Sequence, residues 1–494
     1  MLKKINPNWN KSVISITILL SVVLSIFVLI SPDSTSTMLS NTYGYLSNMF
    51  ESIFIYGTFG LLIFLLILAF SKYGSFEVRL LNKPTYSMLS WCSMLFAAGI
   101  GATILYWATI EWAEYYNILK NNSSINTSEV MLYSRAYPLF HWGFSAWAIY
   151  CLPVVAFGVA MTLNPNSNLT FSGILKPKNY YYKFLLDVLF IGAIICGAGV
   201  GLGLSFPLIS SVISEVLVIE RTIGLDIFTI VVCSTIFGIS AYIGVQNGIR
   251  RLSNINIILV FLFLLIIIAL GPTQYIISNS SETLSFLMKN YVQMSLTTGT
   301  EISIDWSVFY LAWWLALAPM IGTFIVNISN NKSLRQIILG TILVGSFGCM
   351  FCMLVLSNLS IHLYETGIIN SPNIMESNLM PREELVVKTI SSLNYSYILL
   401  LAFSVILIIF LCTTYDSATY VLASASMKDS SIESSKSLRV IFAFLLVIQP
   451  TLLMYLNGVD SFKWIMVIFS VPLLFIYLLL IRSIIKNVYS TKRA

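Results

Sequence analysis

The sequence predicts an all-α integral membrane protein with twelve transmembrane helices. Three observations predict this class: the composition, the length of the apolar runs, and the distribution of basic residues between those runs. Of 494 residues, 57% are hydrophobic and 10% are charged, and the mean hydropathy is +0.86. Soluble domains carry roughly 25% charged residues. Lipid is therefore the expected solvent for most of the chain.

The apolar runs are long enough to cross a bilayer, which takes about 20 mostly apolar residues. Because the first run follows Lys3, Lys4 and Lys11 without a small-residue cleavage site, we expect it to remain as a span. The stretch 274–290 is too polar to span and is expected to lie along the interface. The twelve runs are 13–31, 52–71, 91–116, 137–162, 184–213, 226–245, 255–271, 304–328, 337–358, 394–420, 440–457 and 464–481.

The basic residues between the runs predict an orientation. Of the 27 Lys and Arg residues, 20 fall in the termini and the alternate loops on their side, and seven fall in the opposite loops. Because loops rich in Lys and Arg stay in the cytoplasm, both termini are expected to be cytoplasmic. The net charge of +6 is spread over short loops. A nucleic-acid-binding face, which needs clustered basic residues, is not expected.

Metal, redox and catalytic centres are not expected either. The single CxxC pair, Cys349 and Cys352, lies within an apolar run and has no second pair. The only histidines, His141 and His362, lie on separate segments. The chain has no nucleotide-binding motif, and the longest loop, about 359–393, looks like an ordered extracellular connection. These features exclude a zinc site, a disulfide framework and a soluble output domain.

The third span carries a glycine-rich segment near its middle, where Gly99, Gly101 and Thr103 lie close together. Glycine permits non-helical backbone, and an unwound span is tolerated where it is buried or lines a cavity for substrates and ions. Helix packing through small residues explains the same pattern and, on this segment alone, is favoured. Glu111 and Glu114 near the outer end are consistent with an interfacial position.

The fourth span contains FHWGFSAWAIYC. On a continuous helix of 100° per residue, Trp142, Trp147 and Tyr150 fall within an arc of roughly 140°. Several aromatic faces suit a trimethylammonium cation, which donates no conventional hydrogen bond and is weakly hydrated. The alternative is an aromatic belt at the membrane interface, which the neighbouring His141 and Arg135 keep open.

Two adjacent tryptophans, Trp313 and Trp314, lie in the middle of the eighth span, too deep for an interfacial belt. Pro319 and Gly322 are expected to weaken the helix a turn or two further on. Packing is the commoner role for buried tryptophans. In either role each indole N–H needs a hydrogen-bond partner.

The tenth span carries Thr413, Thr414, Asp416 and Ser417 after a wholly apolar run. Sodium prefers hard oxygen ligands, which hydroxyl groups and the free carbonyls of a broken helix supply. Alternatively, the hydroxyls bond back to carbonyls of their own helix, and Asp416 lies near its cytoplasmic end. Both interpretations stay open at this point.

Four segments, in order and spacing, resemble the betaine/choline/carnitine transporter family: FAAGIG with YWATIEW, FHWGFSAWAIY, WSVFYLAWWLALAP, and TTYDSATYVLA. The resemblance covers the chain from the third span to the last, and the first two spans match only in kind. It implies two N-terminal helices followed by a 5+5 inverted repeat of the sodium-symporter type, often assembled as a homotrimer. The expected divisions are the N-terminal tail with two helices (1–90), the first repeat (91–271), an extracellular connection with an interfacial helix (272–303), the second repeat (304–481) and a short cytoplasmic tail (482–494).

The resemblance also assigns residues to two sites. The residues that match the aromatic box around the ammonium group are Trp142, Trp147, Tyr150 and Trp314, with Trp313 matching a tryptophan on the inner exit path. Those that match the glycine-rich break facing the substrate are Gly99, Ile100 and Gly101, with Thr103 where the family commonly has another glycine. Those that match a sodium site are Ala97 and Ile100, through their carbonyls, with Phe410, Thr413 and Thr414.

Other positions depart from the family pattern. Leu317 replaces a further tryptophan one turn beyond the pair, which predicts a looser box. Residues 185–204 contain no Ser or Thr, so the second proposed sodium position of the family lacks its hydroxyls. Asn256 stands where the sodium-independent exchangers carry an arginine, which favours sodium coupling.

The sequence thus predicts a transporter of a bacterial cell membrane that imports a quaternary-ammonium solute such as glycine betaine, choline or carnitine. We expect symport with Na⁺ as the coupling ion and no organic cofactor. The alternative within transport is sodium-independent exchange of carnitine-like compounds. An enzyme would need a nucleophile, base or metal cluster at depth, and a sensor would need an output domain, and the sequence supplies neither.

Overall fold

The computed structural model describes residues 8–81, 83–98, 101–122, 125–243, 246–428 and 434–490. In this structure, each apolar run predicted from the sequence contains helix. Within the described residues, nine helices are long and apolar enough to cross a membrane, or up to ten if one bent pair counts as a span. The chain is therefore an all-α membrane protein. The count of twelve spans and the inverted repeat of 91–271 with 304–481 stay predictions.

The elements follow one another along the chain as a series of long helices with few strands. The first part contains α1 (Lys11–Ile30), α2 (Pro32–Phe70), η1 (Lys72–Ser75), β1 (Glu77–Val78), α3 (Met88–Ala98), α4 (Ala102–Leu119), α5 (Thr127–Trp142), α6 (Phe144–Leu163), α7 (Phe171–Leu175), α8 (Tyr180–Leu217), α9 (Ile223–Ile243), α10 (Gln246–Leu270) and α11 (Thr273–Met294). The second part contains η2 (Ile302–Ser307), α12 (Val308–Ile328), β2 (Lys332–Ser333), α13 (Leu334–Leu339), η3 (Gly340–Val344), α14 (Gly345–Glu365), α15 (Ser371–Glu376), α16 (Arg382–Ser391), α17 (Ser396–Ala425), α18 (Lys436–Asn457) and α19 (Val459–Ser490).

Several boundaries differ from the predicted ones. The third predicted span is two helices, α3 and α4, and the fourth is interrupted between α5 and α6. The last helix continues to Ser490, beyond the predicted end of the twelfth span at 481. The polar stretch 274–290 lies in α11, which is bent by 113° from the preceding apolar helix. Gly271 and Pro272 occupy the bend, where proline offers no N–H to continue α10.

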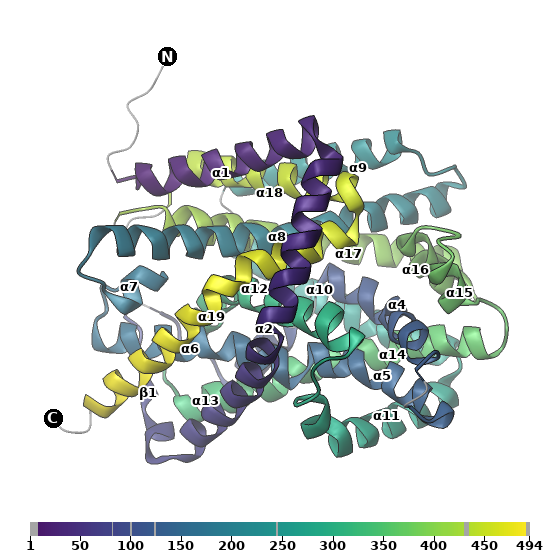
Figure 1. The fold of residues 1–494 in the computed structure, drawn as a ribbon, viewed down its shortest axis with the longest axis horizontal. Helices are drawn as coiled ribbons and strands as arrows, with labels where there is room; N and C mark the ends of the chain where they lie inside the picture. Colours follow the sequence, from purple (N-terminus) through teal and green to yellow (C-terminus); the bar gives the residue numbers. More distant parts are fainter. Residues whose placement is uncertain are drawn as a thin grey trace.

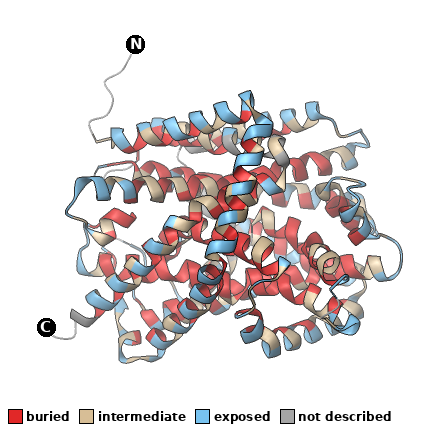
Figure 2. Cartoon of the chain, in the orientation of Figure 1, coloured by how far each residue is buried: buried red, intermediate tan, exposed pale blue. Residues whose placement is uncertain are grey.

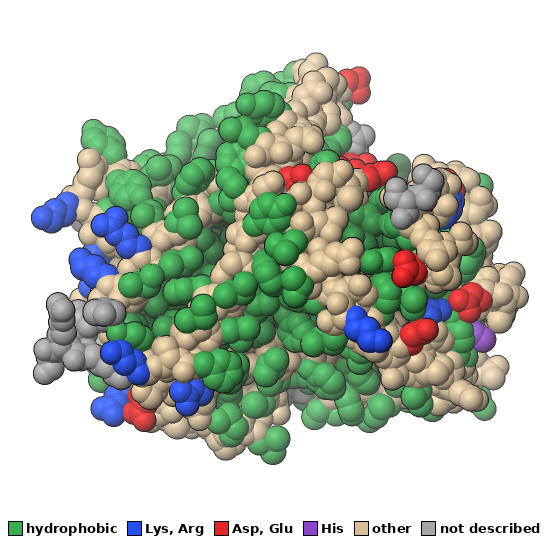
Figure 3. Space-filling model, turned by 60° about the horizontal axis from the view of Figure 1, so that its bottom comes forward, with side chains coloured by type: hydrophobic (Ala, Val, Ile, Leu, Met, Phe, Trp, Pro, Cys, Tyr) green, Lys and Arg blue, Asp and Glu red, His purple; other side chains and the backbone are tan. Residues whose placement is uncertain are grey.

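The two ends of the described chain lie at the same end of the helical bundle. In Figure 1, α1 begins and α19 ends toward the left, whereas α15 and α16 lie toward the right. Figure 3 shows a broad apolar surface between the left and right ends of the bundle. Most visible Lys and Arg side chains lie toward the left end, and most Asp and Glu side chains lie toward the right end. Because both chain ends lie at the same end of the bundle, the arrangement agrees with an even number of membrane crossings.

Burial separates inner helices from peripheral ones. The most apolar windows of Thr127–Leu163 and of Ile302–Ile328 are each 83% buried, whereas those of Lys11–Ile30 and Ile223–Ser240 are each 22% buried. Figure 2 shows the same contrast between the centre of the bundle and the mostly exposed α1 and α2. Because only inner helices are shielded from the surroundings, any enclosed site must lie between them.

The helices α6 and α12 pack against each other at the centre with little space between them. A Cβ atom added to Gly322 of α12 would lie 2.7 Å from Cβ of Pro153 in α6. Despite Pro319 and Gly322, α12 is continuous, so the expected weakening does not interrupt it. Proline is tolerated in membrane helices where neighbouring helices support the freed backbone groups.

Candidate substrate site

The third span is broken within its glycine-rich segment, as the family resemblance implies. The helix α3 ends at Ala98, and α4 begins at Ala102 after an extended N-cap, Gly101, with φ −140° and ψ 176°. A Cβ atom on Gly101 would meet no atom within 4 Å, so this residue faces open space. Gly99 and Ile100 lie outside the described residues, and of Ala97 only the helical backbone is described.

A second interruption separates the predicted aromatic residues of the fourth span. The helix α5 ends at Trp142, Gly143 has φ −94° and ψ −134°, and α6 begins at Phe144. A Cβ atom on Gly143 would collide with the carbonyl oxygen of Leu139 and with Met350. The continuous helical arc that grouped Trp142 with the later aromatic residues is therefore wrong, because the helix stops between them.

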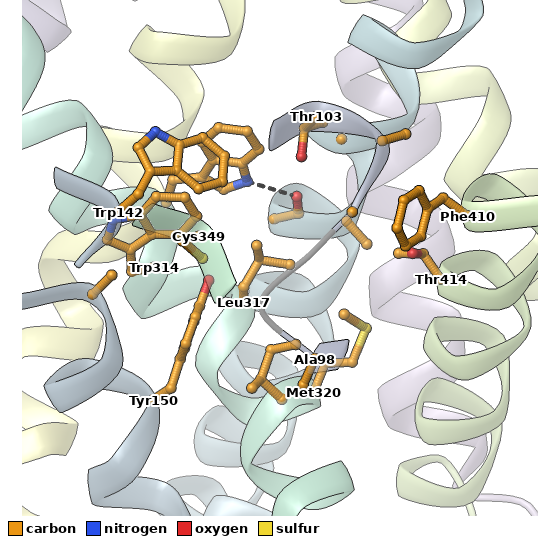
Figure 4. Close-up of a pocket in the computed structure, with 18 of the residues that line it drawn as sticks. Ala98, Thr103, Trp142, Tyr150, Trp314, Leu317, Met320, Cys349, Phe410 and Thr414 are labelled. Carbon is orange, nitrogen blue, oxygen red and sulfur yellow. Dashed lines mark hydrogen bonds between the residues drawn. The ribbon is translucent and has the colours of Figure 1, made fainter. Parts of the chain in front are cut away.

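The aromatic residues nevertheless line one cavity of about 120 Å³ at the centre of the bundle. Figure 4 shows Trp142, Trp314 and Tyr150 on one side and Phe410 and Thr414 on the other. The predicted substrate residues in its lining are Gly101, Thr103, Trp142, Trp147, Tyr150, Trp313 and Trp314. All described members of the predicted substrate set are thus brought together.

Most neighbouring rings in the wall of the cavity contact one another edge to face, whereas Trp313 and Trp314 are stacked with ring centroids 5.1 Å apart. The ring centroids are 4.7 Å apart for Trp142 and Trp314, and 5.9 Å apart for Tyr150 and Trp314. Those of Trp147 and Tyr150 are 5.4 Å apart. Edge-to-face geometry is favourable for aromatic pairs, so the rings support one another without a ligand.

Hydrogen bonds hold three of the four indoles in the wall. Trp313 Nε1 donates to the carbonyl oxygen of Gly197 at 3.0 Å, and Trp314 Nε1 donates to that of His141 at 2.9 Å. Trp142 Nε1 donates to Oε2 of Glu111 at 2.9 Å. The partners predicted for the adjacent tryptophans are present, and these hydrogen bonds fix the orientation of the three rings.

The fourth indole, Trp147 of α6, is held by packing. A Cβ atom added to Gly345, the first residue of α14, would overlap the six-membered part of the Trp147 ring. The ring is 1% exposed. Only glycine allows the backbone of α14 to approach this closely, so Gly345 fixes one edge of the cavity.

Comparison with known proteins identifies the family. Residues 12–493 match the sequence profile of BCCT, the betaine/carnitine/choline family transporters. The chain belongs to this family. An uncharacterized transporter, YeaV, of Escherichia coli (strain K12) is 29% identical over 86% of this chain and 90% of its own length. A carnitine transporter of Acinetobacter baumannii is 26% identical over 96% and 88%, and the glycine betaine transporter OpuD of Bacillus subtilis is 24% identical over 98% and 95%.

Membership makes this chain a membrane transporter and not an enzyme. The ring-walled cavity lies between inner helices, and unwound backbone borders it at Gly101. Interrupted spans with free helix ends are how such transporters present backbone groups to solutes and ions.

The predicted sodium ligands of this BCCT transporter are only partly described. Phe410 and Thr414 line the cavity. The Thr413 hydroxyl donates to the carbonyl oxygens of Ile409 at 3.0 Å and Phe410 at 3.1 Å, both in its own helix. The alternative that this hydroxyl bonds back to its helix is the arrangement seen. The helix α17 is continuous through these residues, so its backbone is not interrupted beside Thr413 and Thr414.

Asn256 of α10 is buried beside this region, and its Nδ2 donates to the carbonyl oxygen of Ile406 at 3.3 Å. This contact places an uncharged amide one turn of α17 before Phe410. Among the described residues, no group of three or more His, Cys, Asp or Glu side chains could hold a metal ion.

Sequence reasoning missed several residues of the site. Ser205, Cys349 and Met320 line the cavity, and Ser205 comes directly after the stretch that was noted for lacking hydroxyls. Glu111, expected at the interface, has no exposed surface. Its position on α4, the helix that begins at the glycine-rich break, was the only feature of the sequence that linked Glu111 to the site. Nothing in the sequence placed it beside Trp142.

Proposed function

We propose that this transporter imports a quaternary-ammonium solute, of the glycine betaine, carnitine or choline type, and holds it in the ring-walled cavity. The observation that carries the proposal is the chemistry of the lining. Among the described residues that line the cavity, none is Asp, Glu, Lys, Arg or His, and four are tryptophans. Aromatic faces are the strongest recognition such a wall offers, and a methylated ammonium group is the cation that suits them.

The start of α4 supports a solute that also carries a carboxylate. Gly101, Ala102 and Thr103 line the cavity and form the N-cap and first helical positions of α4. The first N–H groups of a helix lack partners within the helix, and the helix dipole favours an anion there. A betaine would place its ammonium among the rings and its carboxylate at this helix end. The relatives named for carnitine and glycine betaine transport agree with this solute class.

Sodium coupling is the favoured energy source in this proposal. Thr414 and Phe410 border the same cavity as the rings, so an ion bound there would lie close to the solute. Asn256 introduces no positive charge that would substitute for the ion. The ligands would be completed by Thr413 and by the carbonyls of Ala97 and Ile100.

The orientation and assembly follow the same reasoning. The termini are proposed to be cytoplasmic, because the basic residues gather at the end of the bundle where α1 begins and α19 ends. Assembly as a homotrimer is expected from the family resemblance and is tested by mass measurement of the detergent-purified protein.

A competition panel in proteoliposomes tests the proposed function. Uptake of labelled glycine betaine is measured with carnitine, choline, trimethylamine and ammonium as competitors, with and without a sodium gradient. Inhibition that increases with methylation of the nitrogen supports the aromatic site. Uptake that no methylated ammonium compound inhibits would exclude this solute class.

Sodium-independent exchange is the second candidate mechanism. Uptake into empty and solute-loaded vesicles, both without sodium, separates it from symport. Symport predicts weak uptake in both, whereas exchange predicts rapid uptake only into loaded vesicles. Rapid sodium-free uptake into loaded vesicles would overturn the coupling proposed here.

A further inference from the structure

A fully buried carboxylate lies directly behind the wall of the cavity. Glu111 of α4 has no exposed surface. Its Oε1 accepts a hydrogen bond from the Tyr115 hydroxyl at 2.6 Å, and its Oε2 accepts one from Trp142 Nε1 at 2.9 Å. The Trp142 ring itself lines the cavity. One indole therefore separates this carboxylate from the solute.

The other contacts around Glu111 join it to two further buried side chains. The Tyr115 hydroxyl, which donates to Glu111, lies 2.8 Å from Nδ1 of His141, and Nε2 of His141 lies 2.8 Å from the Ser307 hydroxyl. Nδ1 of His141 also lies 3.6 Å from Oε1 of Glu111. Both oxygens of Glu111 thus accept hydrogen bonds, which is the role of a carboxylate.

The nearby cationic side chains have other partners. Arg382 pairs with Glu114, one turn further along α4, at 2.8 Å. The Lys463 ammonium lies 3.6 Å from the centroid of the Trp306 ring. An ionised carboxylate held away from water is costly unless a cation compensates it. A cationic solute beyond the Trp142 ring would supply that compensation.

The indole transmits the charge by its orientation and its polarity. A charge-assisted hydrogen bond from Nε1 is stronger than a neutral one and fixes the face that Trp142 presents to the cavity. It also pushes electron density into the ring, and a more electron-rich face attracts a cation more strongly. Trp314 is tied to the same cluster through the His141 carbonyl oxygen, at 2.9 Å.

We propose that Glu111 is a positioning residue that determines charge selectivity: acting through the Trp142 N–H, it makes the cavity prefer a cation to an uncharged group of the same shape. This inference rests on the proposed function, because it concerns how the same cavity recognises a methylated ammonium group. It adds the source of the preference, which the uncharged lining does not itself provide.

The test compares glycine betaine with 3,3-dimethylbutanoate, in which carbon replaces the ammonium nitrogen. Both are measured as inhibitors of labelled solute uptake by the full-length protein in proteoliposomes. Glu111→Gln keeps the size of the side chain and removes its charge. We expect the inhibition constant of glycine betaine to rise about tenfold, and that of the carbon analogue to change less than about twofold.

Two further variants separate charge from packing. Glu114→Gln is the matched control, because its carboxylate lies on the same helix and pairs with Arg382 instead of a wall ring. It should leave the ratio of the two inhibition constants unchanged. Trp142→Phe keeps a ring but lacks the N–H, so Glu111→Gln should have little further effect in that background.

An equal loss of affinity for both inhibitors, or an unchanged ratio in Glu111→Gln, would overturn the inference. If Glu111→Gln does not reach the membrane, the ratio in Trp142→Phe alone decides, and an unchanged ratio there has the same meaning. A wild-type protein that binds glycine betaine with no shift in the variants defeats only this inference. A wild-type protein that binds no methylated ammonium compound defeats the proposed function as well.

Discussion

Two parts of the site differ in how their side chains are fixed: the aromatic rings that wall the cavity, and the predicted sodium site, called the seat below. The seat consists of Ala97, Ile100, Phe410, Thr413 and Thr414. The rings contact one another, and three of the four indole N–H groups are bonded to carbonyl or carboxylate oxygens. In the seat, the Thr413 hydroxyl is committed to its own helix, and Ile100 lies outside the described residues. The first region is organised by the protein alone.

The difference follows from the chemistry of the two regions. Aromatic rings exclude water and pack as core residues do, so a cage for a weakly hydrated cation forms during folding. Without an ion, a hydroxyl group donates its hydrogen bond to a nearby carbonyl oxygen of its own helix, as Thr413 does. We therefore expect substitutions in the wall to act on affinity for the solute and substitutions in the seat to act on coupling.

The largest effect is expected for Trp314→Ala. This change removes the ring that contacts both Trp142 and Tyr150. The loss of a desolvated cation–π contact of about 2 kcal/mol corresponds to a roughly thirtyfold rise in the KM for uptake. Trp464→Ala on α19, outside the cavity lining, is the control. Unchanged uptake kinetics in Trp314→Ala would exclude the cage.

Replacement of both Thr413 and Thr414 with Ala should remove the stimulation of uptake by sodium. Coupling between an ion and a solute commonly changes affinity about tenfold, so sodium should no longer lower the KM by that factor. Ser417→Ala is the control, because that hydroxyl donates to the Thr413 carbonyl oxygen and does not line the cavity. Stimulation that persists at normal protein levels would place the ion elsewhere.

Gly322→Ala should destabilise the framework without changing recognition. The added methyl group would lie 2.7 Å from Pro153 in α6, and overpacking of this kind costs about 1–3 kcal/mol. Thermal unfolding in detergent should shift to lower temperature, with the KM of the surviving protein unchanged. Gly238→Ala, where a Cβ meets no atom within 4 Å, is the matched control. Equal stability of the two variants would contradict the close approach of α6 and α12.

The smallest effect is expected for Ser205→Ala. The Ser205 hydroxyl borders the cavity, but it donates to the carbonyl oxygen of Gly201 at 2.6 Å. Because this bond lies within α8, its loss should change the KM by less than about twofold. A larger rise that appears only in sodium would show that Ser205 also contributes an oxygen to the seat.

The composition predicted the class of fold, and the resemblance of four segments to the family predicted the principal rings of the site. The break at Gly101 was implied by the family resemblance, whereas the glycine-rich segment alone favoured helix packing through small residues. The sequence did not predict the interruption at Gly143, where a Cβ would collide with the backbone carbonyl oxygen of Leu139 and with the end of the Met350 side chain in another helix.

The burial of Glu111 was missed for a similar reason. Near the end of a span, a carboxylate is equally compatible with water and with a buried donor, and the donor here, Trp142, belongs to another helix. Within the residues that it describes, the structure yields fewer candidate spans than the twelve predicted from the sequence, because a span that is broken into short helices, such as α3 and α4, does not count as one long apolar helix. The local sequence pattern thus identified the helices, whereas contacts with other helices determined which of their residues are buried at the site.

The contact between Gly345 and Trp147 has a mechanical consequence. A main chain, which cannot rotate aside as a side chain can, occupies the space beside the indole. Trp147 therefore cannot swing toward α14 while that helix stays in place. Because Trp147 lines the cavity, a tilt of α14 toward this ring during the transport cycle would change the volume left for the solute.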